Sequence, residues 1–144
     1  NKGNTEGQKR LTTNAFQLAT GVLFQNPVQM FALTPNNLLD AQKHELDFIR
    51  NLPTTWDETR FIDGYPGKFS VIARRSGETW YVAGVNAEDD AKPLELDLSF
   101  INQEKGQMIY DDGKNLSSSH KEISISDGST KVEMKESGGF VIIL

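Results

Sequence analysis

The chain lacks one residue type entirely, because none of its 144 residues is a cysteine. This absence excludes disulfides, thiolate nucleophiles and cysteine zinc sites, so the fold must depend on an apolar core. The length is that of one ordinary domain, and 37% hydrophobic with 24% charged residues is a globular composition. We therefore expect a folded domain without covalent cross-links.

Positive charge and long apolar runs are also scarce. The chain has fifteen basic and twenty acidic residues, and no basic cluster exceeds a pair. The positive stripe that nucleic acids require is therefore missing. The longest apolar run is far below the ~18 residues of a membrane span, and no charged-then-apolar leader opens the chain. We predict no nucleic-acid partner and no membrane span. Because the first residue is Asn1, we expect the chain to be a piece of a longer reading frame.

The first third of the chain has helical periodicity. Residues 1–10 contain no apolar side chain, which predicts a flexible end. Apolar residues recur at helical spacing from Ala15 to Leu23, after candidate caps at 12–14. Pro27 predicts a break and a new helical turn through Val28 to Phe31, and a further apolar face ends at Pro53. We therefore assign residues 11–53 to a segment of two or three helices.

From residue 54 onward the apolar period changes to two, which is typical of strands. Pairs such as Asp63-Gly64, Ser76-Gly77 and Asp127-Gly128 predict the turns between them. Short strands at this spacing favour a mainly β fold, an antiparallel and Greek-key-like β-sandwich that fills residues 54–144. The eight predicted strands are 56–62, 68–75, 79–85, 94–100, 107–110, 121–125, 130–135 and 140–144.

Residues that could carry out chemistry are few and separated. His44 and His120 lie in different segments, without metal-ligand spacing or a nucleophile motif. The acidic pairs that begin at Asp57, Asp89 and Asp111 are better explained as strand or turn residues than as catalytic or calcium-binding pairs. We predict no catalytic residue and no metal ligand in this chain.

The aromatic pair Trp80 and Tyr81 is the one candidate ligand-binding site. Neighbouring residues on a strand point to opposite faces, so one ring should face inward and the other outward. An outward ring on a β-sandwich can stack against a sugar, although strand aromatics more often belong to a core. We keep Trp80 and Tyr81 as the candidate for oligosaccharide stacking.

Three segments of the sequence resemble the C-terminal part of family 97 glycoside hydrolases, bacterial enzymes that include α-glucosidases and α-galactosidases. FQLATGVLFQNPVQMFALTP (16–35) resembles the end of that family's catalytic barrel, and LPTTWDETRFIDG (52–64) resembles the passage into its last domain. KFSVIARRSGETWYVAGV (68–85) resembles the hairpin that follows. The resemblance covers residues 11–144.

The resemblance implies a C-terminal β-sandwich preceded by helices left over from the end of a (β/α)₈ barrel. The family's catalytic carboxylates and its calcium-binding glutamates would lie upstream, so none is carried over to a residue here. The resemblance also implies a periplasmic or secreted bacterial protein whose main partner is the catalytic barrel of the same polypeptide. A helix at 16–24 without its barrel would expose an apolar face, which could dock elsewhere or pair with another copy.

Three functions remain open at this point. The leading hypothesis is a non-catalytic domain that supports the barrel of an α-glucosidase or α-galactosidase. The alternatives are a carbohydrate-binding module that uses Trp80 or Tyr81, and a protein-interaction domain.

Overall fold

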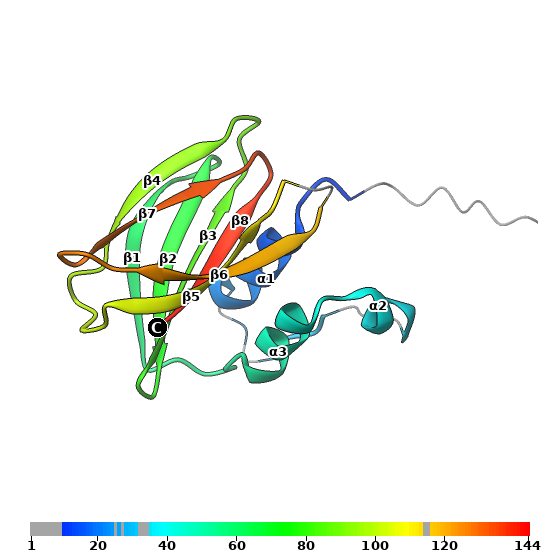
Figure 1. Ribbon diagram of the computed structural model, residues 1–144, viewed down its shortest axis with the longest axis horizontal. Helices are drawn as coiled ribbons and strands as arrows, with labels where there is room; N and C mark the ends of the chain where they lie inside the picture. Colours follow the sequence, from blue (N-terminus) through cyan, green and yellow to red (C-terminus); the bar gives the residue numbers. More distant parts are fainter. Residues whose placement is uncertain (1–9, 25, 27, 32–34, 114–115) are drawn as a thin grey trace, which may run out of the picture.

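The computed structural model describes residues 10–24, 26, 28–31, 35–113 and 116–144. The described part is a β-sandwich with a short helical segment on one side, and the C-terminus lies within the sandwich (Figure 1). The flexible end that we predict for residues 1–10 falls, except for Arg10, outside the described residues.

Three helices precede the strands: α1 (Asn14–Leu23), α2 (Pro35–Asp40) and α3 (Lys43–Asn51). The predicted cap of α1 is confirmed, because the Thr13 hydroxyl accepts the amide N–H of Phe16 at 3.1 Å. The helical turn predicted through Val28 to Phe31 is wrong, since residues 28–31 form no helix. The side chain of Asn26 accepts the amide N–H of Val28 there, a turn that competes with helical hydrogen bonding.

All eight predicted strands are present, with ends shifted by a few residues. They are β1 (Glu58–Tyr65), β2 (Phe69–Ser76), β3 (Thr79–Asn86), β4 (Lys92–Asp97), β5 (Lys105–Asp111), β6 (Ser118–Ser124), β7 (Ser129–Met134) and β8 (Gly139–Ile143).

One predicted turn is wrong. Asp63-Gly64 lies inside β1, where the pairing with β2 shifts register between Phe61 and Asp63. A bulge needs the same permissive residues as a turn, so the sequence pattern could not separate the two. The β1–β2 hairpin closes after Tyr65, where the amide N–H of Lys68 donates to the carbonyl of Tyr65.

The strands form two antiparallel sheets. The larger has the order β1-β2-β3-β8-β5-β6, and the smaller consists of β4 and β7. The last strand, β8, is therefore inserted between β3 and β5, and the chain visits the smaller sheet twice. This arrangement confirms the predicted mainly β, antiparallel fold of eight strands preceded by helices.

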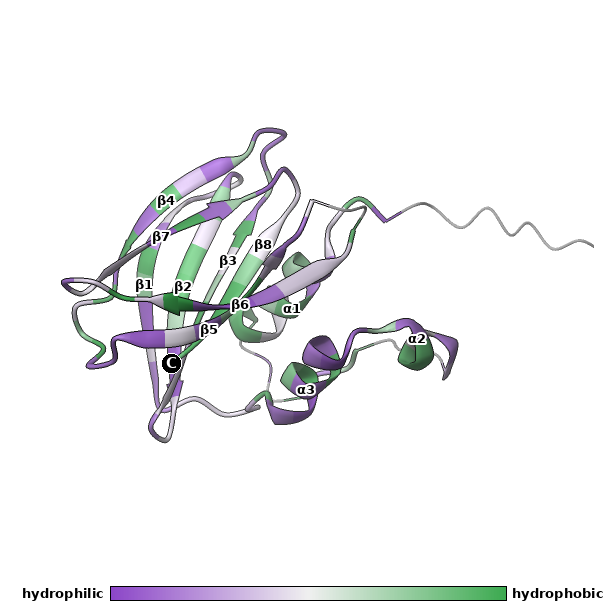
Figure 2. Ribbon diagram, in the orientation of Figure 1, coloured by the Kyte–Doolittle hydropathy of each residue, from purple (hydrophilic) through white to green (hydrophobic). Residues whose placement is uncertain are grey.

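Each face of the six-stranded sheet is covered by a different layer. One face packs against β4 and β7 around buried residues that include Val71, Leu96, Met134 and Phe140. The other face packs against α1 and α3 through Leu18, Val22 and Phe48. Figure 2 shows green apolar stretches along the central strands, while much of α3 is purple. The described protein is thus three layers, with two apolar cores that share one sheet.

The second core corrects our expectation about the helix at 16–24. Ala15, Leu18, Ala19 and Val22 of α1 are all buried against the outer face of the sheet. The apolar face of α1 is not exposed, and it is not available for a second copy. The reason is that β3 and β8 are apolar on both faces, so the sandwich itself supplies the surface that the helix needs.

No described helix has both the length and the apolar character needed to cross a bilayer.

Candidate functional site

The candidate sugar-stacking residues, Trp80 and Tyr81, point to opposite faces of β3 as predicted. Trp80 packs between the two sheets, where its ring meets Phe100 edge-on at 5.1 Å. Tyr81 lies under the helical layer, where Trp56 meets it edge-on at 5.4 Å. Each residue is only 8% exposed, so neither ring offers a free face to a pyranose. Their ligand role stays a prediction, and their burial favours a core role.

Burial also raises the pKa of the Tyr81 phenol, as expected for a group that cannot easily become charged where it lies. A shallow hollow of about 360 Å³ opens beside this ring, between α3 and the sheet. Its lining combines apolar Phe48, Ile109 and Ile143 with polar side chains, namely His44, Asp47, Asn51, Gln107 and His120. Because Tyr81 itself is only 8% exposed, its ring has no open face to stack against a sugar in this hollow.

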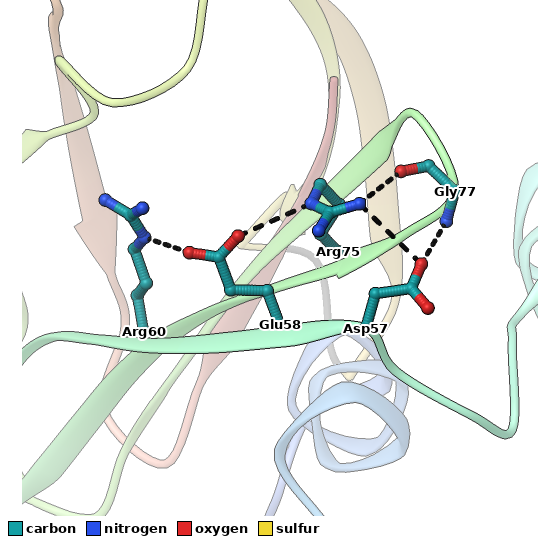
Figure 3. A network of polar contacts seen from close by, with 5 residues as sticks. All are labelled: Asp57, Glu58, Arg60, Arg75 and Gly77. Atoms are coloured by element: carbon teal, nitrogen blue, oxygen red, sulfur yellow. Dashed lines mark hydrogen bonds and ion pairs between the residues drawn. The ribbon is translucent and has the colours of Figure 1, made fainter.

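The acidic pair Asp57 and Glu58 is occupied by structural contacts. Figure 3 shows Arg75 between the two carboxylates: its Nε is 3.5 Å from Glu58, its Nη1 is 3.7 Å from Asp57, and Nη1 donates to the Gly77 carbonyl at 2.8 Å. Arg60 donates to Glu58 from the other side at 2.6 Å. These bonds hold the start of β1 against the β2–β3 hairpin and lower the pKa of Glu58, chiefly through Arg60. Both carboxylates act in the fold, as we predict.

A polar junction joins α3 to β6. Its centre is Glu45, a buried carboxylate in the first turn of α3. One oxygen accepts hydrogen bonds from Ser118 Oγ at 2.6 Å and Asn14 Nδ2 at 2.9 Å, and the other accepts the amide N–H of Gln42. Glu45 therefore ties α1, α3 and the sheet together, and its charge is compensated by three donors.

His44 extends this junction to the protein surface. Its Nε2 lies 2.9 Å from Ser118 Oγ, whose proton is directed to Glu45, so Nε2–H is the donor. The ring lies 4.7 Å from that of His120. The pKa of His44 lies below its ordinary value. Burial is the largest cause and lowers the pKa, Glu45 raises it, and His120 lowers it.

Although it combines serine, histidine and glutamate, the junction is not built like a hydrolytic triad. In a triad the serine oxygen is open to substrate and gives its proton to histidine. Here Ser118 is fully buried and its proton goes to the carboxylate. The sequence analysis left His44 and His120 in separate segments, and nothing in their spacing could show that α3 lies across β6.

Two further buried polar groups fix α1 in place. The guanidinium of Arg74 donates to the carbonyls of Phe24 and Leu23 at the end of the helix, at 3.0 and 3.3 Å. At the start of the helix, Asp111 accepts the amide N–H of Gly139 at 2.8 Å and bonds the Thr13 hydroxyl. Burial raises the pKa of Asp111 despite these bonds. The sequence predicted only a strand or turn position for Asp111, and no local pattern could show that Asp111 and Arg74 both reach α1, because those contacts join distant segments.

Among the described residues, the large exposed apolar side chains fall in two stretches of the sequence. Six lie in the helical segment, and two lie on β1. The helical-segment surface consists of Leu11, Phe24, Val28, Met30, Leu38 and Leu39. Phe61 and Tyr65 lie near the turn that joins β1 to β2, where their partners Ile72 and Phe69 on β2 place them on opposite faces of the sheet.

The described residues thus show a well-packed scaffold with polar junctions and exposed apolar surfaces. None of them forms a group of three or more histidines or acids placed to hold a metal ion. The fold and these polar groups define an antiparallel β-sandwich domain with an attached helical segment.

Comparison with known proteins identifies the family of this domain. Residues 55–144 match the family described as "Glycosyl-hydrolase 97 C-terminal, oligomerisation". The chain is 33% identical over 137 residues to a retaining α-galactosidase of Bacteroides thetaiotaomicron. The matched region covers 90% of this chain and 20% of that protein. A probable retaining α-galactosidase of Streptomyces bingchenggensis is 37% identical over 52% of this chain and 12% of its own length.

Solved structures agree with this result. A β-arabinopyranosidase is 46% identical, with a TM-score of 0.90 over the whole of this chain and 23% of its own. A glycoside hydrolase family 97 enzyme of Pseudoalteromonas sp. strain K8, solved in complex with panose, is 31% identical, with a TM-score of 0.79 over 92% of this chain and 22% of its own.

The chain belongs to glycoside hydrolase family 97 and contains that family's C-terminal domain. It spans about a fifth or less of the length of the curated relatives that it matches.

Proposed function

We propose that this chain is the non-catalytic C-terminal part of a family 97 glycosidase, in which it supports the catalytic barrel of the same polypeptide. The helical-segment surface carries this proposal. Met30 is 90% exposed and Leu39 is 85% exposed, and four further large apolar residues accompany them in a stretch of about thirty residues. Apolar surface concentrated in this way is typical of a face that another protein layer covers.

The position of this surface also supports the proposal. It lies outside residues 55–144, which match the C-terminal family, and within residues 11–53, the helices that the resemblance assigns to the end of a barrel. The apolar face of α1 is directed to the sheet, whereas Phe24, Met30 and Leu39 remain exposed. The helical segment would then contact the sandwich on one side and the barrel on the other.

For the whole protein we propose hydrolysis of α-galactosides or α-glucosides. The α-galactosidase relatives support the first, and the family member in complex with panose supports the second. The β-arabinopyranosidase neighbour, at 46% identity, favours β-arabinopyranosides as a further candidate substrate. Catalytic carboxylates and a bound calcium would belong to the barrel, and the family resemblance suggests a periplasmic or secreted protein.

We further propose that the domain takes part in self-assembly, on the strength of the family description, which names oligomerisation. The test of the proposed function has two parts. First, the 144-residue chain should not hydrolyse aryl α-galactosides, α-glucosides or β-arabinopyranosides, with or without calcium. Turnover by the purified chain would contradict a non-catalytic role.

Second, the polypeptide extended upstream through its barrel should hydrolyse one of these substrates and should depend on the helical-segment surface. Leu39→Asp should lower the melting temperature of the extended protein but leave that of the 144-residue chain unchanged. Asp40→Asn, a change of charge at the neighbouring exposed position, is the matched control. If Leu39→Asp has no effect in the extended protein, the helical segment is not the docking face.

A further inference from the structure

Two imidazole rings meet where α3 lies across the edge of the larger sheet. His44 of α3 is half-buried, and His120 belongs to β6, the terminal strand of that sheet. The ring centroids are 4.7 Å apart, and the ring planes are inclined by 35°. Histidine is the side chain whose ordinary pKa lies nearest to neutrality, so a contact of this kind can respond to mild acid.

The neutral form of His44 satisfies the hydrogen bonds at this contact. Its Nε2–H donates to Ser118 Oγ at 2.9 Å, and the Ser118 hydroxyl donates to Glu45 at 2.6 Å. The neutral ring already carries the one proton that this chain of hydrogen bonds needs. A second proton, on Nδ1, would add a charge to a half-buried ring without adding to its bond with Ser118.

On the helical side, two carboxylates lie near His44. Glu45 favours the charged ring, although it already accepts three hydrogen bonds. Asp47 lines the same hollow, but its carboxylate is paired with Lys43, and Arg50 lies 3.7 Å from it. The neighbouring helix α1 has no ionisable side chain. Glu45 is therefore the main group of this layer that would stabilise a positive His44.

On the sheet side, no free anion faces His44. His120 would place a second positive charge against the first. Glu122 lies on the same face of β6 and is paired with Lys105 at 3.0 Å. Tyr81 of β3 is uncharged, since burial raises the pKa of its phenol. Burial and His120 outweigh Glu45, so the pKa of His44 lies below its ordinary value of 6.5.

We propose that the His44–His120 contact is a pH switch, which holds α3 on the sheet at neutral pH and releases it in mild acid. Protonation puts charge on a half-buried ring beside a second imidazole, and separation of α3 from β6 relieves both costs. α3 is the element that moves, because it fully buries only Phe48 and Glu45. The inference depends neither on docking to a barrel nor on self-assembly.

The attachment of α3 should weaken as the pH falls, not as it rises. A group whose pKa is lower in the folded state contributes stability that is present above its unfolded pKa and lost as the pH falls through the folded pKa. For His44 the unfolded value is 6.5, so the attachment is strongest above this pH. At about one pH unit below it, protonation of a released His44 can favour the open form by up to about tenfold.

Amide hydrogen exchange of the 144-residue chain at about pH 7.5 and pH 5.5 tests the switch, with protection corrected for the intrinsic pH dependence of exchange. Protection of residues 43–51 should fall about three- to tenfold at the lower pH, while β3 and β8 stay unchanged. His44→Gln keeps a side-chain N–H for Ser118 but cannot become charged, so it should abolish the fall. His120→Gln should reduce it. Lys131→Gln, which removes an exposed positive charge from β7, is the control and should behave as wild type.

An NMR titration of the imidazole protons in the wild-type chain makes the test independent of how the variants fold. His44 should titrate below pH 6.5, at the pH where residues 43–51 lose protection. The switch is overturned if the protection of residues 43–51 is equal at both pH values, or if it falls equally in His44→Gln. Titration of His44 at or above 6.5 would overturn it too, as would a loss of protection spread evenly over all strands.

Discussion

Arg74 is a cation in the interior of the protein, where an unpaired charge is costly. Its guanidinium lies over the ring of Trp56 at 5.6 Å and donates to the two carbonyls at the end of α1. Those carbonyls have no partner within the helix, so the arginine acts as a helix cap contributed by β2. A single side chain thus connects the helical layer to the sheet.

Replacing this cap should destabilise the protein measurably. We expect Arg74→Ala to lower the free energy of unfolding by roughly 2 to 4 kcal/mol, because the two helix-end carbonyls lose their donors and a cavity opens beside Trp56. Urea denaturation followed by tryptophan fluorescence measures the change. Arg50→Ala, which removes an exposed guanidinium, should change it little. Equal effects of the two substitutions would rule out the capping role.

Asp111 should give the stability a specific dependence on pH. Burial raises its pKa in the folded state, so the folded chain holds this proton at pH values where the unfolded chain has lost it. Its contribution to stability is thus present at low pH and is lost as the pH rises through the folded pKa. We expect Asp111→Asn to remove this loss, so that the variant gains stability relative to wild type as the pH rises from about 3.8.

Asp97 provides a control of opposite sign. Hydrogen bonds from Ser99 lower its pKa, so its contribution is present above the unfolded pKa and is lost as the pH falls. Asp97→Asn should therefore lose stability relative to wild type as the pH rises toward about 3.8, whereas Asp111→Asn gains stability above that value. Unfolding curves at a series of pH values measure both differences. If the stabilities of wild type and Asp111→Asn changed with pH in parallel, burial would not shift the pKa of the Asp111 carboxyl.

At the scale of elements, α3 is held mainly by polar contacts. It fully buries Phe48 and Glu45, while its other seven residues are half-buried or exposed. Glu45 bonds Asn14 of α1 and Ser118 of β6, so the position of α3 depends on this one carboxylate. An element fixed by few buried apolar contacts is expected to open before the rest of the fold.

Ser118→Ala tests this dependence. The substitution removes the hydroxyl that donates to Glu45 and accepts from His44, and it leaves the buried carboxylate with fewer donors. We expect amide hydrogen exchange to accelerate in residues 43–51 and to stay unchanged in β3 and β8. Ser129→Ala, which loses one exposed hydroxyl contact, is the matched control. If hydrogen exchange instead accelerated uniformly over the whole chain, α3 would not open independently of the rest of the fold.

At the scale of the whole molecule, the stable unit is larger than the part that matches the C-terminal family. The match begins at residue 55, yet α1 covers the outer face of the sheet, including Ala83 and Val141. Removing α1 would return this apolar face to water. The sandwich and its helical layer therefore form one packed body, although their sequence patterns differ.

Truncation to residues 55–144 should accordingly produce a weakened protein. The loss of Leu18 and Val22 alone removes burial worth about 3 to 6 kcal/mol. We expect a lower melting temperature and increased binding of a hydrophobic dye. Removal of residues 1–9 only is the control and should change neither measurement. A truncated sandwich as stable as the full chain would show that the helical layer is dispensable.

Much of the fold could be predicted from local pattern. The change of apolar period near Pro53, the alternation in the strands and the Thr13 cap each depend on neighbouring residues, and each was predicted correctly. Local pattern failed where one signal serves two structures. Asp63-Gly64 fits a turn and a bulge equally, and the apolar residues at 28–31 did not make a helix.

Tertiary structure decided which surfaces are covered. Strand alternation placed Trp80 and Tyr81 on opposite faces, but only the packing of two layers showed that both rings are buried. The junction of His44, Glu45 and Ser118 joins residues more than seventy positions apart, which no spacing rule can relate. Periodicity specifies which residues share a face. What lies against that face is settled only when distant segments meet, as it is at α1 and at the uncovered rings of Phe61 and Tyr65.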